Sequence, residues 1–284
     1  MGTMSNPSHA AWQRLRKGAI AVALASVVAS LAACGGNVSA GPPDTEPYPI
    51  DNQPGWKFVF GDNFETPAPL GTFLDKYGSK WGAYPFPYQD TSHEVRSDPG
   101  YYYPQKTLSV ANGIMDAWMH YDAALGKYLV AAPIPKLPTM QYGKFILRLR
   151  SDDIAGYKVT PLLWPDSENG DDGEINLPEG TLNGADFKAF YHPEGGAKAG
   201  QAEFSTGVNS HQWHTFETDW SPGKVDLIVD GESIGSATNS VPSKPMHWVL
   251  QFETQIKKTP PPQSSQGHIQ VDWVTAYTYD GPGK

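Results

Sequence analysis

Residues 213–231 read WHTFETDWSPGKVDLIVDG, and this stretch shows most clearly how the chain folds. Its first half places Phe216 and Trp220 on one face of a strand, because residues two or four apart point the same way. Its second half, VDLIV at residues 225–229, repeats that alternation and runs into Asp230-Gly231, a strong hairpin signal. The stretch therefore predicts antiparallel strands joined by tight turns.

The same alternation recurs on both sides of this stretch, at residues 145–150 and 269–273. The chain holds 29 Gly and 26 Pro, which favour turns and long loops. From Trp56 onward we find neither a capped apolar helix pattern of several turns nor an internal repeat. We therefore expect an all-β fold, a sandwich or jelly roll whose curved sheets offer a concave face with a cleft.

Composition narrows the classes of function. Of the 284 residues 12% are aromatic, with 9 Trp and 14 Tyr, and these side chains suit both β-strands and sugar-stacking surfaces. The formal charge is −9, and it becomes about −12 without the three cations of the first 33 residues. A domain this acidic is a poor partner for nucleic acid, which needs clustered Lys and Arg, and for anionic lipid surfaces.

The first residues of the chain have the features of an export signal. Three cations precede an uncharged apolar run at 18–33, which is short for a membrane span and fits a signal peptide. The run ends in Leu-Ala-Ala-Cys-Gly, which resembles a bacterial lipobox with Cys34 as the lipidated residue. We expect residues 1–33 to be a signal peptide, and the protein to be an exported, membrane-anchored lipoprotein at the cell surface or in the outer membrane facing the periplasm. A plain membrane anchor with a chance cysteine is the alternative.

Cys34 is the only cysteine, so no internal disulfide and no cysteine metal cluster can form. Residues 34–54 are rich in Gly and Pro, and we expect them to comprise the lipidated cysteine and a flexible tether. Residues 55–284 are then one domain, which the length allows because all-β domains often exceed about 200 residues. We expect this domain to be monomeric.

The chemistry is concentrated in residues 174–179, EINLPE. In a regular strand Glu174 and Asn176 share a face, whereas Glu179, five positions on, points away from Glu174. One inserted residue, a β-bulge, returns Glu179 to the same face, and Pro178 suits a bulge or an edge. Two carboxylates held close together push one pKa up, which yields one acid and one anion near neutral pH. Glycoside hydrolysis needs that division, and a solvated strand face is the alternative.

Motifs around these residues carry a family resemblance. They are DGEINLPEG at 172–180, FGDNF at 60–64, YGKF at 142–145, WHTF at 213–216 and VDWV at 271–274. In this order they resemble glycoside hydrolase family 16, which includes laminarinases, lichenases, agarases and carrageenases. The first motif is similar to the bulged Glu-x-Asp-x-x-Glu signature of the laminarinase-like branch. The resemblance covers about residues 56–279, and it implies a concanavalin-like β-jelly-roll sandwich and a retaining mechanism.

By that resemblance Glu174 is the expected nucleophile and Glu179 the expected general acid/base, about 5–5.5 Å apart as in retaining enzymes. The middle Asp of the signature is Asn176 in this chain. An amide donates a hydrogen bond but cannot take up or release a proton. The change also removes a negative charge and should ease ionisation of both glutamates. We therefore expect low activity, or activity shifted to lower pH.

Four further residues are candidates for contact with a polysaccharide substrate. Trp164 leads directly into the motif, and His192 matches a strand that crosses the family's cleft. Gln251 alternates onto the same face as Glu253, and Trp118 is a further aromatic candidate. Each of these side chains is equally consistent with a place in the core or a structural role.

The resemblance implies that catalysis requires no cofactor. We find no His/Glu spacing for catalytic zinc and no phosphate-binding Gly loop in the sequence. The resemblance also implies a structural calcium on the convex face, with Asp272 among its ligands. Asn63 stands where the family has an early Glu, which weakens this prediction.

Three functions stay open at this point. The first is an endo-acting glycoside hydrolase that cleaves a β-linked polysaccharide, either of the β-1,3-glucan type or a bacterial exopolysaccharide. The second is a lectin-like binding protein of the same fold, and the third a transglycosylase that remodels exopolysaccharide. The presence of both Glu174 and Glu179 favours an enzyme, whereas Asn176 favours the lectin.

Overall fold

The computed structural model describes residues 48–282. The expected signal peptide, residues 1–33, and the expected lipidation site, Cys34, lie outside the described residues. Within them, strands dominate and the helices α2 (Phe73–Tyr77) and α3 (Pro104–Thr107) are each about one turn long. In this described part, no helix combines the length and the apolar character that crossing a membrane requires.

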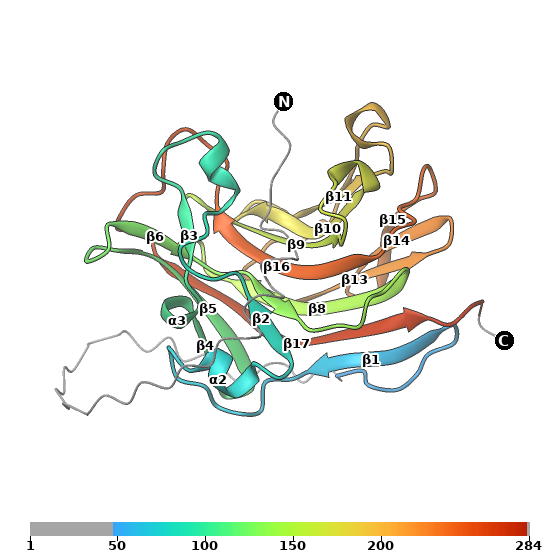
Figure 1. Cartoon of the computed structure of the whole chain (residues 1–284), viewed down its shortest axis with the longest axis horizontal. Helices are drawn as coiled ribbons and strands as arrows, with labels where there is room; N and C mark the ends of the chain where they lie inside the picture. The colour runs from blue at the N-terminus through green and yellow to red at the C-terminus, as the bar shows by residue number, and fades with distance from the viewer. Residues whose placement is uncertain (1–47, 283–284) are drawn as a thin grey trace.

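The larger of two main sheets contains most strands of the chain. They are β1 (Trp56–Asp62), β3 (Gly100–Tyr102), β4 (Leu108–Ala111), β5 (Ile114–Asp122), β6 (Lys127–Val130), β8 (Gly143–Ser151), β13 (His214–Ser221), β14 (Lys224–Val229), β15 (Glu232–Ala237) and β17 (Gly267–Tyr279). Their order is β15-β14-β13-β8-β17-β5-β6-β3, with β1 added to β17 and β4 to β5 (Figure 1). All these pairs are antiparallel except β3 with β6.

The smaller sheet lies above the larger one in Figure 1 and has the order β12-β11-β10-β9-β16. Its strands are β9 (Tyr157–Pro165), β10 (Glu174–Thr181), β11 (Lys188–His192), β12 (Ala202–Ser205) and β16 (Met246–Thr254). A two-stranded sheet pairs β2 (Trp81–Ala83) with β7 (Pro133–Pro135). Short 3₁₀ turns are η2 (Thr91–Glu94), η3 (Gly170–Asp172) and η4 (Gly196–Lys198).

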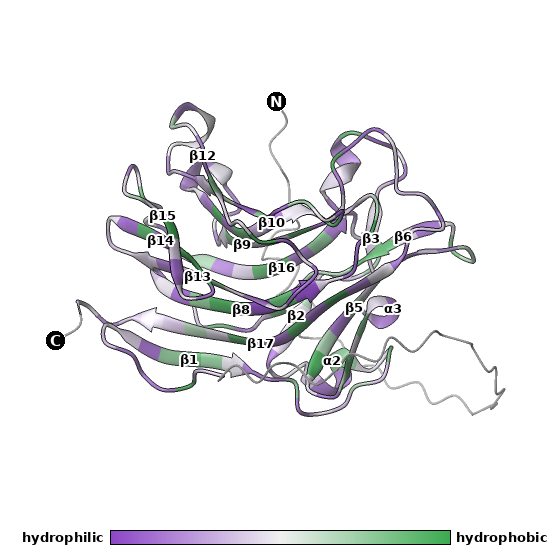
Figure 2. Cartoon of the chain, turned by 180° about the vertical axis from the view of Figure 1, so that it is seen from behind, coloured by the Kyte–Doolittle hydropathy of each residue, from purple (hydrophilic) through white to green (hydrophobic). Residues whose placement is uncertain are grey.

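The core lies between the two main sheets, because alternate side chains of each sheet point toward the other. Phe145 of β8 meets Trp248 of β16 edge to face, with ring centroids 5.5 Å apart. Phe216 of β13 lies 6.0 Å from Phe187, which directly precedes β11. Figure 2 shows hydrophobic segments along β5, β8 and β17. This packing leaves the other face of the smaller sheet available for polar side chains.

The architecture confirms the predicted all-β jelly-roll sandwich. The alternating stretches at 145–150, 214–220 and 269–273 lie in β8, β13 and β17. The predicted hairpin at Asp230-Gly231 joins β14 to β15. Both turn residues have positive φ, 50° and 80°, as a two-residue turn of this hand requires.

Candidate active site

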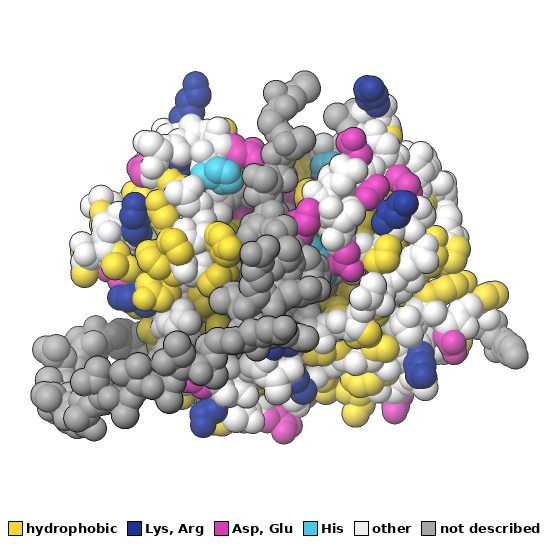
Figure 3. All heavy atoms as spheres, in the orientation of Figure 1, with side chains coloured by type: hydrophobic (Ala, Val, Ile, Leu, Met, Phe, Trp, Pro, Cys, Tyr) yellow, Lys and Arg dark blue, Asp and Glu magenta, His cyan; other side chains and the backbone are white. Residues whose placement is uncertain are grey.

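The open face of the smaller sheet forms the floor of a cleft with a cavity volume of about 480 Å³. Its lining residues come from β9, β10 and β11, from Gln251 on β16, from the loop around η2, and from Tyr102, Gln201 and Ile256. They are Pro87, Tyr88, Gln89, Thr91, His93, Glu94, Tyr102, Lys158, Thr160, Leu162, Trp164, Glu174, Asn176, Glu179, Phe190, His192, Gln201, Gln251 and Ile256. On the face drawn in Figure 3, acidic side chains gather over β10, β11 and the adjoining loops.

The predicted bulge on β10 is confirmed. Asn176 pairs with Phe190 of β11 and Glu179 with Lys188, so three steps along β10 oppose two along β11. The register with β9 shifts in the same segment. The extra residue returns Glu179 to the face of Glu174 and Asn176, and all three side chains line the cleft.

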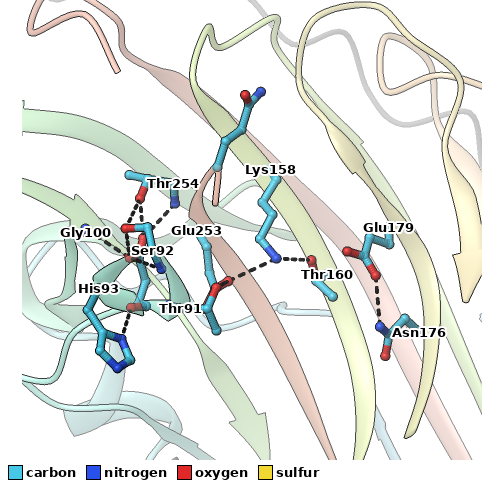
Figure 4. Close-up of polar contacts among 12 residues, drawn as sticks. Thr91, Ser92, His93, Gly100, Lys158, Thr160, Asn176, Glu179, Glu253 and Thr254 are labelled. Atoms are coloured by element: carbon cyan, nitrogen blue, oxygen red, sulfur yellow. Dashed lines mark hydrogen bonds and ion pairs between the residues drawn. The ribbon is translucent and has the colours of Figure 1, made fainter. Parts of the chain in front are cut away.

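Asn176 is the polar link between the two glutamates. It is 2% exposed, and its Nδ2 donates to Glu179 Oε2 over 2.9 Å. Figure 4 shows its nitrogen turned toward Glu179 and its oxygen turned away. That oxygen, Oδ1, is buried without a hydrogen-bond partner among the described residues. An unpaired buried carbonyl is costly in general, so this oxygen is a candidate acceptor for a donor on water or substrate in the cleft.

Glu174 is partly buried on the floor of the cleft, directly opposite His192 of β11. Burial raises the pKa of Glu174, because a carboxylate loses its solvation there. The charge of His192 and a hydrogen bond from Asn176 oppose that rise, while the charge of Glu179 adds to it. Burial is thus the first cause of the raised pKa of Glu174, and the charge of Glu179 is a smaller one.

Lys158 of β9 supplies a positive charge beside Glu179. Its Nζ lies 3.2 Å from Glu253 Oε2 and donates to Thr160 Oγ1 over 3.1 Å (Figure 4). Burial opposes the charge of Lys158, but Glu253 and Glu179 raise its pKa, so the ammonium stays charged. The cleft floor therefore carries a cation between the buried Glu253 and the cleft-lining Glu179.

A buried acidic group fixes the loop that forms one wall of the cleft. Asp90 is fully buried; its Oδ1 accepts from Ser92 N and Gly100 N, each over 3.1 Å. Its Oδ2 accepts from Thr254 N over 2.8 Å, across 164 residues of chain. The neighbouring Glu253 accepts from Thr91 Oγ1 over 2.7 Å. Figure 4 shows Thr91, Ser92, Gly100, Glu253 and Thr254 on one side of Lys158, and Asn176 and Glu179 on the other. The wall is thus tied to β16 by polar contacts.

The structure brings three of the four predicted substrate contacts to the cleft. Trp164, His192 and Gln251 all line it, and Trp164 Nε1 donates to Glu168 Oε2 over 3.1 Å. Trp118 does not line it. That residue lies on β5 of the larger sheet, where its ring stacks on His120 at 3.6 Å.

The residues around Asp272 do not fit the calcium site that the resemblance implies. Asp272 Oδ2 lies 3.1 Å from Arg148 Nε, so a guanidinium already faces the carboxylate. Across residues 48–282, no group of three or more His, Cys, Asp or Glu side chains is arranged to hold a metal ion. Calcium prefers several oxygen ligands, and a cation beside the expected ligand opposes its binding.

Several cleft residues were not predicted from the sequence. Lys158 and Thr160 lie an even number of positions from Trp164 on β9, so alternation along the strand places all three on the same face. Tyr88, Gln89 and the residues of η2 come from an irregular segment, for which no such pattern exists.

Comparisons with known proteins agree with this geometry. The family model described as Glycosyl hydrolases family 16 matches residues 134–275. No curated protein matches the chain in sequence.

Several solved structures share the fold. The laminarinase from Rhodothermus marinus is 18% identical with a TM-score of 0.64, over 80% of this chain and 99% of that one. The catalytic domain of an endo-1,3-β-glucanase from Thermotoga petrophila is 15% identical with a TM-score of 0.60, over 81% and 100%. The Bacillus licheniformis β-glucanase is 16% identical with a TM-score of 0.60, over 78% and 98%. At such identities the likeness shows the fold alone.

Proposed function

The chain belongs to glycosyl hydrolase family 16, and from that premise we propose that it hydrolyses internal bonds of a β-1,3-linked glucan with retention of configuration. One observation carries the proposal: the bulge in β10 presents Glu174 and Glu179 on one cleft-lining face, joined through Asn176. The names of the similar structures, a laminarinase and two β-glucanases, support the substrate class.

In the proposed reaction Glu174 attacks the anomeric carbon while Glu179 protonates the departing glycosidic oxygen. This forms a covalent glycosyl-enzyme and releases one end of the chain. Glu179, now an anion, takes a proton from water, whose oxygen displaces Glu174 from the same carbon. The amide of Asn176 donates to Glu179 and so holds that carboxyl group in place throughout.

The raised pKa of Glu174 limits the pH range of this reaction. Glu174 must be anionic to attack, and burial favours its neutral form. Activity should therefore fall on the acid side at a pH above the ordinary titration range of a glutamate, near 4.3. A substrate that fills the cleft excludes further water and enlarges this effect.

The test is a panel of β-1,3-, β-1,4- and mixed-linked glucans, galactans and bacterial exopolysaccharides, with proton NMR of the first product formed. We expect cleavage of a β-1,3-linked glucan and initial release of the β-anomer. Early α-anomer would remove Glu174 as the nucleophile, and cleavage of an exopolysaccharide alone would reassign the substrate. Binding without cleavage would make the protein a lectin, and longer products than the substrate would make it a transglycosylase.

We also propose that the catalytic domain is held at a membrane through lipidated Cys34. The apolar run, the lipobox-like residues and the single cysteine support this. Membrane fractionation of cells expressing Cys34→Ser tests it: the variant should leave the membrane fraction with its glycan activity intact. A variant that stays in that fraction contradicts the proposal.

A further inference from the structure

A second aromatic surface lies beside the cleft, on the loop that forms its wall. Phe86 is 40% exposed and stacks on Tyr103, with ring centroids 4.7 Å apart and planes at 26°. The ring of Tyr101 is tilted by 40° to that of Phe86, with centroids 6.1 Å apart. We call Phe86, Tyr101 and Tyr103 the aromatic shelf. Phe86 is exposed and both tyrosines are half-buried, so part of this aromatic surface is open to a ligand.

The aromatic shelf lies on the outer side of the cleft wall. Side chains alternate along β3, so Tyr101 points away from Tyr102, which lines the cleft. The shelf and the cleft meet at the rim, where Pro87 and Tyr88 line the cleft directly after Phe86. Figure 3 shows hydrophobic side chains gathered on this side of the molecule, over β3 and β6.

Two polar side chains, Gln89 and Lys127, hold the Tyr101 ring in place. Gln89 Nε2 donates to the hydroxyl of Tyr101 over 2.9 Å. Lys127 Nζ donates to the same hydroxyl over 3.2 Å and lies 4.5 Å from the centroid of the Tyr101 ring. Flat apolar faces with hydrogen-bonding groups at their edges match a pyranose ring, which has C–H faces and hydroxyl edges.

The shelf is also fixed relative to the cleft. Asp90 and Glu253 tie the wall to β16, and Tyr102 N donates to Tyr88 O over 2.9 Å beside the shelf. A surface held in this way loses little conformational entropy when a ligand binds, so even a small contact area is effective.

From these observations we propose that the aromatic shelf is a glycan-binding site outside the cleft, which binds a further stretch of the polysaccharide being cleaved. The inference rests on the proposed function for the identity of that polymer. A folded protein partner fits less well, because the exposed parts of three rings fall far below the roughly 800 Å² per partner of a stable interface. A glycan chain is narrow enough for this area and is already present at the rim.

The experiment measures affinity for a soluble β-1,3-glucan by electrophoresis through gels containing the polymer, in a Glu174→Ala background that leaves it uncut. The test variant carries Phe86→Leu and Tyr103→Leu, which keep apolar bulk but remove the ring faces. Leu70→Ala is the matched control, because Leu70 is also exposed, at 46%, and belongs neither to the shelf nor to the cleft lining. We expect the dissociation constant for the polymer to rise about tenfold in the test variant and to stay unchanged in the control.

A second measurement compares cleavage of polymer and of a short oligosaccharide that fills only the cleft. In protein that retains Glu174, the shelf substitutions should lower kcat/KM for the polymer relative to kcat/KM for the oligosaccharide. The loss should appear as a higher KM for the polymer, with kcat unchanged. Equal polymer affinity in shelf variant and parent overturns the inference and leaves the proposed function standing. Loss of polymer binding in a protein that cleaves no glycan supports the shelf and overturns the proposed function. A change of oligomeric state without a change in glycan affinity assigns the shelf to a second copy and overturns the inference.

Discussion

Two acidic pairs lie close together in this protein, and they differ in how their charges are satisfied. Asp90 and Glu253 are fully buried, and backbone N–H groups, hydroxyls and the Lys158 ammonium surround them. Glu174 and Glu179 line the open cleft, where Asn176 Nδ2 donates to Glu179 and the charges of His192 and Lys158 act on Glu174. The oxygens of Asp90 and Glu253 already accept hydrogen bonds from the protein, whereas those of Glu174 and Glu179 remain accessible to a ligand in the cleft. A carboxylate already saturated with protein donors cannot easily bind a proton or a carbon centre, so under the proposed function we expect the cleft-lining pair, and not the fully buried pair, to react.

The largest expected effect is the loss of hydrolysis when Glu174 or Glu179 is replaced. Glu174→Ala should abolish hydrolysis, because no glycosyl-enzyme can form without the nucleophile. Glu179→Ala should lower cleavage of natural glycans by about a hundredfold or more, the scale of losing general acid–base catalysis. It should still react with substrates that carry a good leaving group. Steady-state kinetics with both substrate types measures the difference.

Azide distinguishes the two roles in the same assay. In Glu174→Ala azide should give a product of inverted configuration, and in Glu179→Ala it should speed the second step with retention. Reversed outcomes would exchange the two assignments. Glu232→Gln is the control, since Glu232 is exposed on β15. Full activity in both alanine variants would place the active site elsewhere.

The next effect is a loss of stability when Asp90, of the fully buried pair, is replaced. Asp90→Asn replaces an acceptor oxygen by an amide N–H that faces backbone donors at Ser92, Gly100 or Thr254. We expect the free energy of unfolding to fall by about 2–3 kcal/mol, the scale of an unsatisfied buried group. Urea denaturation measures it. Asp98→Asn, in the same loop but with an exposed side chain, should change stability by less than about 0.5 kcal/mol. Equal stability in both variants would mean that Asp90 does not hold the wall.

The shared face of Glu174 and Glu179 could be predicted from the sequence, whereas the contacts of Asp90 and Glu253 could not. The spacing of Glu174 and Glu179, with Pro178 between them, already required an irregular strand, and the register of β10 confirms it. Local spacing suffices there because one strand carries both groups. Asp90 contacts Thr254 across 164 residues, and no local pattern encodes such a contact.

The same limit explains the other differences between expectation and structure. Alternation along β5 predicts a strand for Trp118, but not that the strand belongs to the larger sheet. Nor does it reveal that Arg148 of β8 faces Asp272, which depends on the pairing of β8 with β17. Alternation in the sequence predicts which residues share a face of a strand. Which residues that face contacts depends on the order in which the strands pair.

A smaller effect concerns how the ionisation of Glu174 changes the free energy of unfolding with pH. The pKa of Glu174 is raised in the folded state, so the folded protein binds this proton more tightly than the unfolded chain does. Stability therefore falls as pH rises from the unfolded value, near 4.3, through the folded one. Glu174→Gln carries no such charge and should be more stable than the parent by about 1 kcal/mol at pH 7. Thermal unfolding at pH 7 and pH 4 checks it, with the difference shrinking at pH 4. A less stable variant at pH 7 would contradict the assignment.

The smallest expected effect changes the group between the two glutamates. Asn176→Asp restores a carboxyl group where the amide now donates to Glu179 Oε2. The substitution removes that donor and adds a negative charge beside both carboxyl groups, and both changes oppose ionisation of Glu174 and Glu179. The pH optimum should therefore rise by about half a unit, while kcat at the optimum stays within about tenfold of the parent. Asn176→Ala is the matched comparison, because it removes the donor without adding charge. It should shift the optimum in the same direction but by less. A pH–rate profile that is unmoved in Asn176→Asp would mean that the side chain at this position does not act on the pair. An equal shift of the pH optimum in both variants would assign the effect to the lost hydrogen bond alone. The two acidic pairs would then differ in the hydrogen-bond donors around them and not in the charges nearby.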